Sequence, residues 1–134
     1  MKALAAAVVT NTKKQPKVPK PKGSPPAKLI ADDIVAGKGP AAKSGDQLTV
    51  DYVGESWSNG KVFDASWKRH QTFPLTLGQG SVIKGWDDGL VGMKAGGRRM
   101  LVIPPDLGYG ASGQPPSIGP NETLVFVIDL RKIG

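Results

Sequence analysis

The chain has 134 residues, enough for one ordinary domain with a substantial hydrophobic core. It contains no cysteine and one histidine, His70, which excludes disulfides and thiol catalysis and disfavours a zinc cage or a Ser-His-Asp triad. The net charge of +7 is unevenly distributed. Residues 1–28 hold seven lysines and no acid, whereas the remainder holds 11 Lys and Arg against 11 Asp and Glu. A neutral body is not typical of a nucleic-acid groove, so we expect no specific nucleic-acid partner.

The first ten residues place one lysine before a short apolar run, a weak match to a signal peptide. A disordered N-terminus or a shortened chain is the favoured alternative, and the compartment, cytoplasmic or exported, stays open. Residues 11–27 are rich in Pro and Lys, which favours an extended, solvated spacer. We therefore expect a disordered basic tail or linker over residues 1–27 and a folded domain over 28–134. No apolar stretch approaches the ~20 residues of a membrane span.

Beyond the tail, short apolar runs bounded by turn residues predict strands over 28–35, 47–56, 62–66, 71–77, 99–105 and 123–133. Residues 82–93 are the one good helical candidate, although glycines interrupt them. The Gly-, Pro- and Ser-rich stretch 106–122 predicts a long loop, and loops of that length inside a domain are usually functional. The pattern indicates an α+β fold: a twisted antiparallel sheet of about five strands with one short helix on one face.

The inventory of reactive residues is sparse. The sequence has no phosphate-binding loop, no HExxH and no GxSxG. Asp87 and Asp88 could be imagined as a metal or acid/base pair, but acids in the first half of a short helix are favoured by its dipole. His70 lies in a polar stretch and is expected on the surface. We expect neither a metal nor a cofactor.

Six of the eight aromatic residues are spread over predicted strands, helix and loop, and any one alone is more often a core residue. Trp86 stands between a glycine and two aspartates, and Tyr109 stands between two glycines, where nothing in the local pattern requires burial. If the six converge, they form an apolar concavity with a few polar tips, the usual form of a peptide or small-ligand site. The six are Tyr52, Phe63, Phe73, Trp86, Tyr109 and Phe126.

Four segments closely resemble FKBP-type peptidyl-prolyl isomerases: DYVGESWSNGKVFDAS (51–66), LGQGSVIKGWDDGLVGMKAGGRR (77–99), IPPDLGYGASG (103–113) and ETLVFVIDL (122–130). The resemblance covers roughly residues 28–133. It implies a half-barrel, in which the sheet wraps around the helix and encloses a pocket for Xaa-Pro peptides or the macrolides tacrolimus and rapamycin. It also implies a monomeric enzyme that assists the folding of unfolded or partly folded proteins.

The resemblance further implies the residues of the pocket. Trp86 is expected at the floor, where the proline ring stacks, and Gly85 is expected to keep the start of the helix accessible to ligand. The expected substrate-binding set is Tyr52, Phe63, Asp64, Phe73, Val82, Ile83, Trp86, Tyr109, Ile118 and Phe126.

Four of these residues are expected to act in catalysis: Asp64, Tyr109, Ile83 and Tyr52. The backbone N–H of Ile83 and the hydroxyl of Tyr109 would hold carbonyl groups of the substrate. Asp64 would either interact with the rotated carbonyl or orient Tyr52 and Arg69, and the sequence leaves both roles open.

The long loop departs from the family pattern. Gln114 stands where many members have His, Gly119 where they have Pro, and Ser117 where the residue is often apolar. Leu107 replaces an aromatic found in some members, with no expected consequence. The loop changes are expected to affect loop rigidity, peptide preference and drug affinity without touching the floor. Two other hypotheses are a non-catalytic binder of proline segments and a module tethered to polyanions through its lysine tail.

Overall fold

The computed structural model describes residue 8 and residues 10–134. Across these residues the chain forms a six-stranded antiparallel sheet in the order β1-β5-β6-β2-β3, with β4 also paired to β2. This confirms the predicted α+β half-barrel, with one strand more than the five or so expected. The strands are β1 (Ile30–Val35), β2 (Gln47–Ser56), β3 (Val62–Ala65), β4 (Phe73–Thr76), β5 (Arg98–Ile103) and β6 (Leu124–Ile133).

The six strands match the six ranges predicted from sequence but occupy five positions across the sheet, because two short strands share one edge of β2. β3 pairs with residues 53–55 of β2, and β4 pairs with residues 47–50. Among the strands of the described residues, the intervening Asp51 and Tyr52 therefore have no partner on that side, although both pair with β6 on the other.

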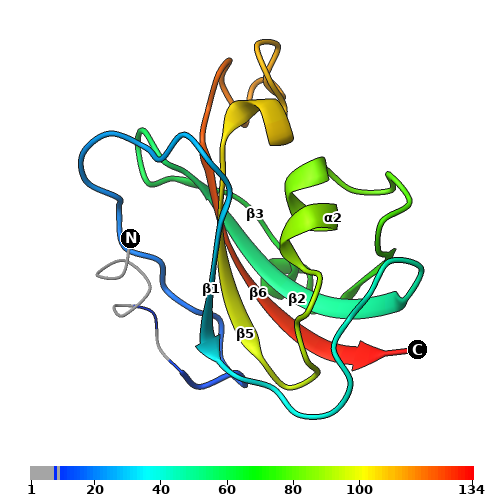
Figure 1. Ribbon diagram of the computed structural model, residues 1–134. Helices are drawn as coiled ribbons and strands as arrows, with labels where there is room; N and C mark the ends of the chain where they lie inside the picture. The colour runs from blue at the N-terminus through cyan, green and yellow to red at the C-terminus, as the bar shows by residue number, and fades with distance from the viewer. Residues whose placement is uncertain (1–7, 9) are drawn as a thin grey trace.

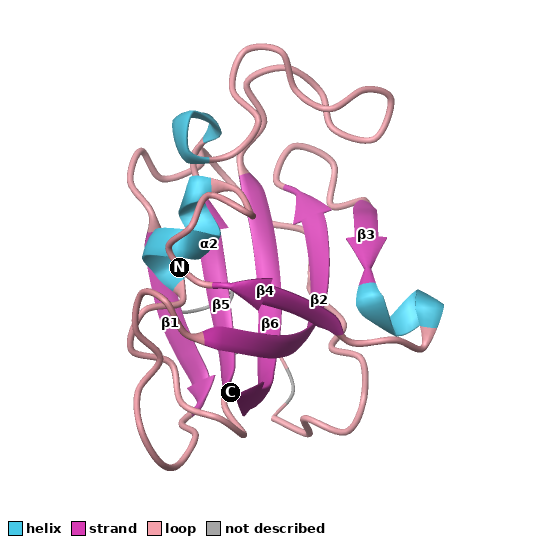
Figure 2. Cartoon of the chain, turned by 90° about the vertical axis from the view of Figure 1, so that its right-hand side faces the viewer, coloured by secondary structure: helices cyan, strands magenta, loops and turns pink. Residues whose placement is uncertain are grey.

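The helix α2 (Lys84–Gly89) lies against the concave face of the sheet (Figures 1 and 2). It is shorter than the predicted 82–93, because Ile83 is still extended (φ −59°, ψ 151°) and forms the N-cap. A Cβ on Gly85 would lie 2.5 Å from Ile103, and one on Gly89 would lie 2.8 Å from Leu101. These glycines therefore bring α2 close to β5, a reason different from the ligand access expected for Gly85.

Side chains alternate between the two faces of the sheet and build two apolar clusters. On the inner face, Leu124, Phe126 and Ile128 of β6 join the large cluster that includes Trp86. On the outer face, Val125 and Val127 pack with a second cluster that contains Trp57, Met100 and Val102. Because both faces are covered, every residue of β5 is buried.

Residues 10–27 lie along the outer face, on the side of the sheet opposite α2 (Figure 1). Pro16 and Pro21 are buried and Val18 packs against the outer cluster, whereas the lysines of this segment are exposed. The segment thus turns its apolar residues toward the sheet and its lysines toward solvent.

Arginines of the sheet hold the backbone of the same segment. Arg98 donates to the carbonyl of Lys14 at 2.8 Å, and Arg131 donates to the carbonyl of Thr12 at 2.6 Å. The segment expected to be a solvated spacer is therefore in contact with the sheet, while the division of the chain at residue 28 stays a prediction.

Most of the expected signal-like stretch, residues 1–7 and 9, lies outside the described residues. None of the helices formed by residue 8 or residues 10–134 is long and apolar enough to cross a membrane.

Two single turns of 3-10 helix complete the fold. The first, η1 (Ser66–Arg69), follows β3 directly, and its C-cap is His70, an exposed residue in the left-handed region (φ 50°). The second, η2 (Pro105–Leu107), leads into the long loop. Residues of η1 contact Tyr52 and Asp64, which line the pocket described next.

Candidate active site

A cavity of about 400 Å³ opens between the concave face of the sheet, α2 and the long loop. It brings together all ten residues of the expected substrate-binding set, which come from four strands, α2, the segment before α2 and two places in the loop. Three further residues, Ser81, Gln114 and Ser117, complete the lining. The full lining is Tyr52, Phe63, Asp64, Phe73, Ser81, Val82, Ile83, Trp86, Tyr109, Gln114, Ser117, Ile118 and Phe126.

The indole of Trp86 is 4% exposed and is held by three neighbouring rings. Tyr52 and Phe126 each meet it edge-on, with ring centroids 5.2 Å away and interplanar angles of 79° and 89°. Phe73 meets it at 6.0 Å and 89°. Edge-to-face contacts of this kind stabilise each pair beyond the burial of area alone, so the indole has one defined orientation in the cavity.

One wall of the cavity depends on a glycine. Phe63 and Phe126 pack edge-to-face with centroids 5.5 Å apart, directly over Gly54 of β2. A Cβ at that position would lie 2.6 Å from Phe126 and 2.7 Å from Phe63. Any larger residue would therefore push both rings into the space that a ligand would occupy.

Asp64, Arg69 and Tyr52 form the polar corner of the cavity. The Tyr52 hydroxyl donates a short hydrogen bond to Oδ2 of Asp64. Arg69 donates to Oδ1 of Asp64 at 2.6 Å and to the Tyr52 hydroxyl at 2.9 Å. Arg69 therefore contacts both Asp64 and Tyr52. The backbone N–H of Ala65 adds a further bond to Asp64 at 2.9 Å.

These contacts give the Asp64 carboxyl and the Tyr52 phenol different protonation states at neutral pH. Burial and then the hydrogen bond to Asp64 raise the pKa of Tyr52 to about 12. Burial opposes ionisation of Asp64, but the hydrogen bonds from Tyr52 and Arg69 outweigh it and hold the pKa of Asp64 below its usual range. At neutral pH the corner thus holds a carboxylate, a guanidinium and a neutral phenol.

Two further residues of the lining, Tyr109 and Ile83, carry hydrogen-bond donors. Tyr109 is 37% exposed, and burial followed by the charge of Asp64 raises the pKa of its hydroxyl, which therefore keeps its proton. Among the described residues, the N–H of Ile83 has no acceptor, because this residue precedes the helix and lies outside every strand. Both groups are free to donate to a ligand.

The rim contains the residues that sequence reasoning did not include in the site. Gln114 and Ile118 exchange two backbone hydrogen bonds of 2.9 Å, which close the loop into a tight turn above the cavity. This turn carries Ser117 to the lining. The departures from the family pattern at Gln114 and Ser117 were the sequence signal that could have placed these two residues in the site. Ser81 carried no such signal beyond its position next to Val82.

The carboxylates of Asp87 and Asp88 make different contacts. The carboxylate of Asp87 accepts the N–H groups of Gly78 at 2.8 Å and Gly80 at 3.0 Å, which ties the loop before the cavity to α2. Asp88 pairs with Lys84 on the surface. The two carboxylates do not converge, and their roles extend beyond the helix-dipole preference inferred from sequence.

Comparison with known proteins agrees with this geometry. A sequence model of the family described as FKBP-type peptidyl-prolyl cis-trans isomerase matches residues 39–131. An FK506-binding protein of Streptomyces anulatus is 50% identical over 117 residues, which cover 87% of this chain and 94% of that protein. The 39 kDa FK506-binding nuclear protein of Drosophila melanogaster is 50% identical over 101 residues, 75% of this chain but 28% of that longer protein.

Among solved structures, the crystal structure of AtFKBP13 matches with a TM-score of 0.75 and 38% sequence identity, covering 82% of this chain and 96% of that chain. Fold, sequence and family model thus agree over nearly the whole sheet and its helix. The chain belongs to the FKBP-type peptidyl-prolyl cis-trans isomerases, enzymes that accelerate rotation about Xaa-Pro bonds.

Proposed function

We propose that the substrates of this isomerase are proline-containing segments of unfolded or partly folded proteins, and that the proline ring stacks on Trp86. The observation that supports this most directly is the indole at the base of the cavity, fixed edge-on by Tyr52, Phe73 and Phe126. A rigid apolar floor of this size suits a compact, uncharged ring that carries no N–H group.

The chemistry needs no covalent step. Rotation about the peptide bond has a barrier of ~18–20 kcal/mol because the planar amide is stabilised by resonance. At the twisted transition state that resonance is lost and the amide is less dipolar. A cavity that replaces water with apolar side chains therefore favours the twisted form over the planar one. A factor of ten in rate requires about 1.4 kcal/mol of this preference.

The polar groups of the cavity orient the amide during rotation. We assign the Tyr109 hydroxyl and the Ile83 N–H to carbonyl groups that flank the proline, because both donors are free to bond to a ligand. We assign the Asp64 carboxylate, held by Arg69 and Tyr52, to the rotating carbonyl group. A fixed charge interacts more strongly with such a dipole once the bound peptide has displaced water from between them.

We also propose that FK506 binds in the same cavity and competes with peptide. The names of the Streptomyces and Drosophila relatives, each an FK506-binding protein at 50% identity, support this assignment. Rapamycin is the second macrolide expected from the family resemblance.

The test is a cis-to-trans assay on Xaa-Pro peptides with and without FK506. We expect acceleration above the uncatalysed rate, inhibition by FK506, and several-fold slower turnover for Tyr109→Phe, which removes one donor from a half-exposed ring without disturbing the core. Peptide binding without any acceleration would contradict the proposal and would favour a non-catalytic binder. Acceleration that FK506 does not inhibit would reject the shared cavity alone.

A further inference from the structure

The gap between β3 and β4 leaves the peptide group of Tyr52 without a strand partner on one side. A buried backbone N–H needs an acceptor, because leaving it unpaired costs about as much as a lost hydrogen bond. Ser66, which is 0% exposed, supplies that acceptor: the Tyr52 N–H donates to its Oγ at 2.8 Å. One hydroxyl thus replaces the missing rung of the ladder beside the cavity.

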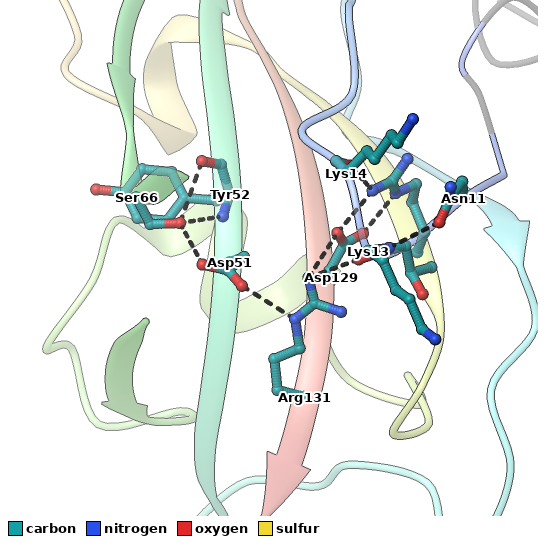
Figure 3. A network of polar contacts seen from close by, with 10 residues as sticks. Asn11, Lys13, Lys14, Asp51, Tyr52, Ser66, Asp129 and Arg131 are labelled. Atoms are coloured by element: carbon teal, nitrogen blue, oxygen red, sulfur yellow. Dashed lines mark hydrogen bonds and ion pairs between the residues drawn. The ribbon is translucent and has the colours of Figure 1, made fainter. Parts of the chain in front are cut away.

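The remaining bonds of this hydroxyl fix its direction. Its single proton is donated to Oδ1 of Asp51 at 2.8 Å, since a carboxylate can only accept, while the carbonyl of Tyr52 lies farther away at 3.5 Å. Ser66 therefore accepts from one residue of β2 and donates to the residue before it. Figure 3 shows this pair of bonds, with Ser66 lying against β2 beside Asp51 and Tyr52.

Asp51 is in turn held by Arg131, whose Nε donates to Oδ2 at 3.0 Å (Figure 3). Arg131 is the additional residue of a bulge in β6, because Thr49 and Val50 of β2 face Lys132 and Leu130. Bulges redirect side chains, often next to active sites. The guanidinium of Arg131 also lies 5.3 Å from the ring centroid of Trp67, the second residue of η1.

The turn η1 connects this network to the polar corner of the cavity. It begins at Ser66, two residues after Asp64, and ends at Arg69, which contacts both Asp64 and the Tyr52 hydroxyl. No side chain caps the start of η1. Apart from the bonds of Arg69 itself, the side-chain contacts that hold η1 in the described part of the chain are those of Ser66 with β2 and of Trp67 with Arg131.

We propose that Ser66, held by Asp51 and Arg131, is a positioning residue for isomerisation: it fixes η1 on β2 so that Arg69 keeps Asp64 and Tyr52 in place at the cavity wall. Ser66 itself does not line the cavity. The inference rests on the proposed function, but its structural consequence at Asp64 can be measured without turnover.

The test uses the full chain with Ser66→Ala and, separately, Asp51→Asn. Losing one hydrogen bond of this kind should lower kcat by about fivefold while KM for an Xaa-Pro peptide stays within twofold, because the Trp86 floor is untouched. Asp51→Asn should give a smaller loss in the same direction, since its amide oxygen can still accept from Ser66. In both variants the carboxyl of Asp64, followed by carbon NMR, should titrate at higher pH as Arg69 loosens.

The matched control is Ser58→Ala, which removes another serine–carboxylate bond, that of the Ser58 hydroxyl to Glu122 at 2.6 Å, away from the cavity. It should change neither kcat nor the titration of Asp64. Wild-type kcat together with an unchanged Asp64 titration in a folded Ser66→Ala protein would overturn the inference; if that variant does not fold, the same result for Asp51→Asn would overturn it. An inactive wild-type protein would instead refute the proposed function, and the NMR titration would still decide the role of Ser66.

Discussion

The indole Nε1 of Trp57 donates a hydrogen bond of 3.0 Å to the carbonyl of Gly23, 34 positions earlier in the chain. The bond joins the end of the N-terminal segment to the region just after β2, and the ring itself is buried in the outer cluster. An apolar face that would otherwise meet water is thus covered by a segment with the composition of a linker.

We therefore predict that deleting residues 1–23 destabilises the protein. Exposing Trp57 and the valines around it should lower the free energy of unfolding by about 3 kcal/mol, since burying one large apolar side chain contributes about 1.5–3 kcal/mol. Chemical denaturation would measure this loss, and binding of a hydrophobic dye would report the uncovered face. Peptide turnover at low temperature should stay within a few-fold of wild type, because the cavity lies on the opposite face. Unchanged stability would show that the segment does not cover the sheet in solution.

The glycines around Trp86 should prove intolerant of a single methyl group. Gly85→Ala places a Cβ 2.5 Å from Ile103, and we expect it to destabilise the protein by about 2 kcal/mol. Helix propensity alone would predict the opposite sign, a gain of about 1 kcal/mol. Gly119→Ala is the matched control, because a Cβ there meets nothing within 4 Å and its backbone is not left-handed. A stabilising Gly85→Ala would refute the close packing of α2 on β5.

Glu55 gives the stability an unusual pH dependence. Its side chain is 0% exposed, and neither carboxylate oxygen has a hydrogen-bond partner among the described residues. Burial raises the pKa of Glu55 to about 8. Between its ordinary value of 4.5 and about 8, the unfolded chain releases this proton while the folded protein keeps it, so this group makes stability fall as the pH rises.

Glu55→Gln removes that dependence because the amide is neutral throughout. Its stability relative to wild type, measured by denaturation at several pH values, should rise from pH 5 to about pH 8 and then level off. Glu122→Gln is the control at the other glutamate, whose carboxylate is bonded to Ser58. An advantage of Glu55→Gln that is constant over this range would exclude a buried, protonated Glu55.

Asp64→Asn should lower kcat/KM by about tenfold without unfolding the protein, because hydrogen bonds to a charged group contribute about 1.5 kcal/mol or more. The low pKa of Asp64 means that wild-type activity holds as the pH falls until this carboxylate takes up a proton, whereas the variant should show no such decline. Asp88→Asn, which breaks a comparable surface pair with Lys84, is the control and should be fully active. An Asp64→Asn protein with wild-type turnover would remove Asp64 from the mechanism.

Much of the site could be predicted from sequence because it is carried by short motifs. The segments 51–66 and 77–99 contain seven residues of the lining, the other two motifs add Tyr109 and Phe126, and the order of the four segments along the chain identifies the family. The motifs did not predict the residues at the rim of the cavity. Gln114 and Ser117 reach the cavity through the turn closed between Gln114 and Ile118, a geometry that depends on the loop as a whole.

By itself, the sequence determined the strands and the helix through local alternation and turn residues, and the resemblance of its motifs to a known family implied the residues of the cavity, because both signals lie within a few neighbouring positions. Only the tertiary structure decided how distant groups meet. Arg131 contacts Asp51 and Thr12, which lie 80 and 119 positions away. No local sequence pattern predicts a contact between residues so far apart in the chain. The same holds for Pro16 and Val18, whose burial depends on an apolar face formed by strands that follow much later in the chain.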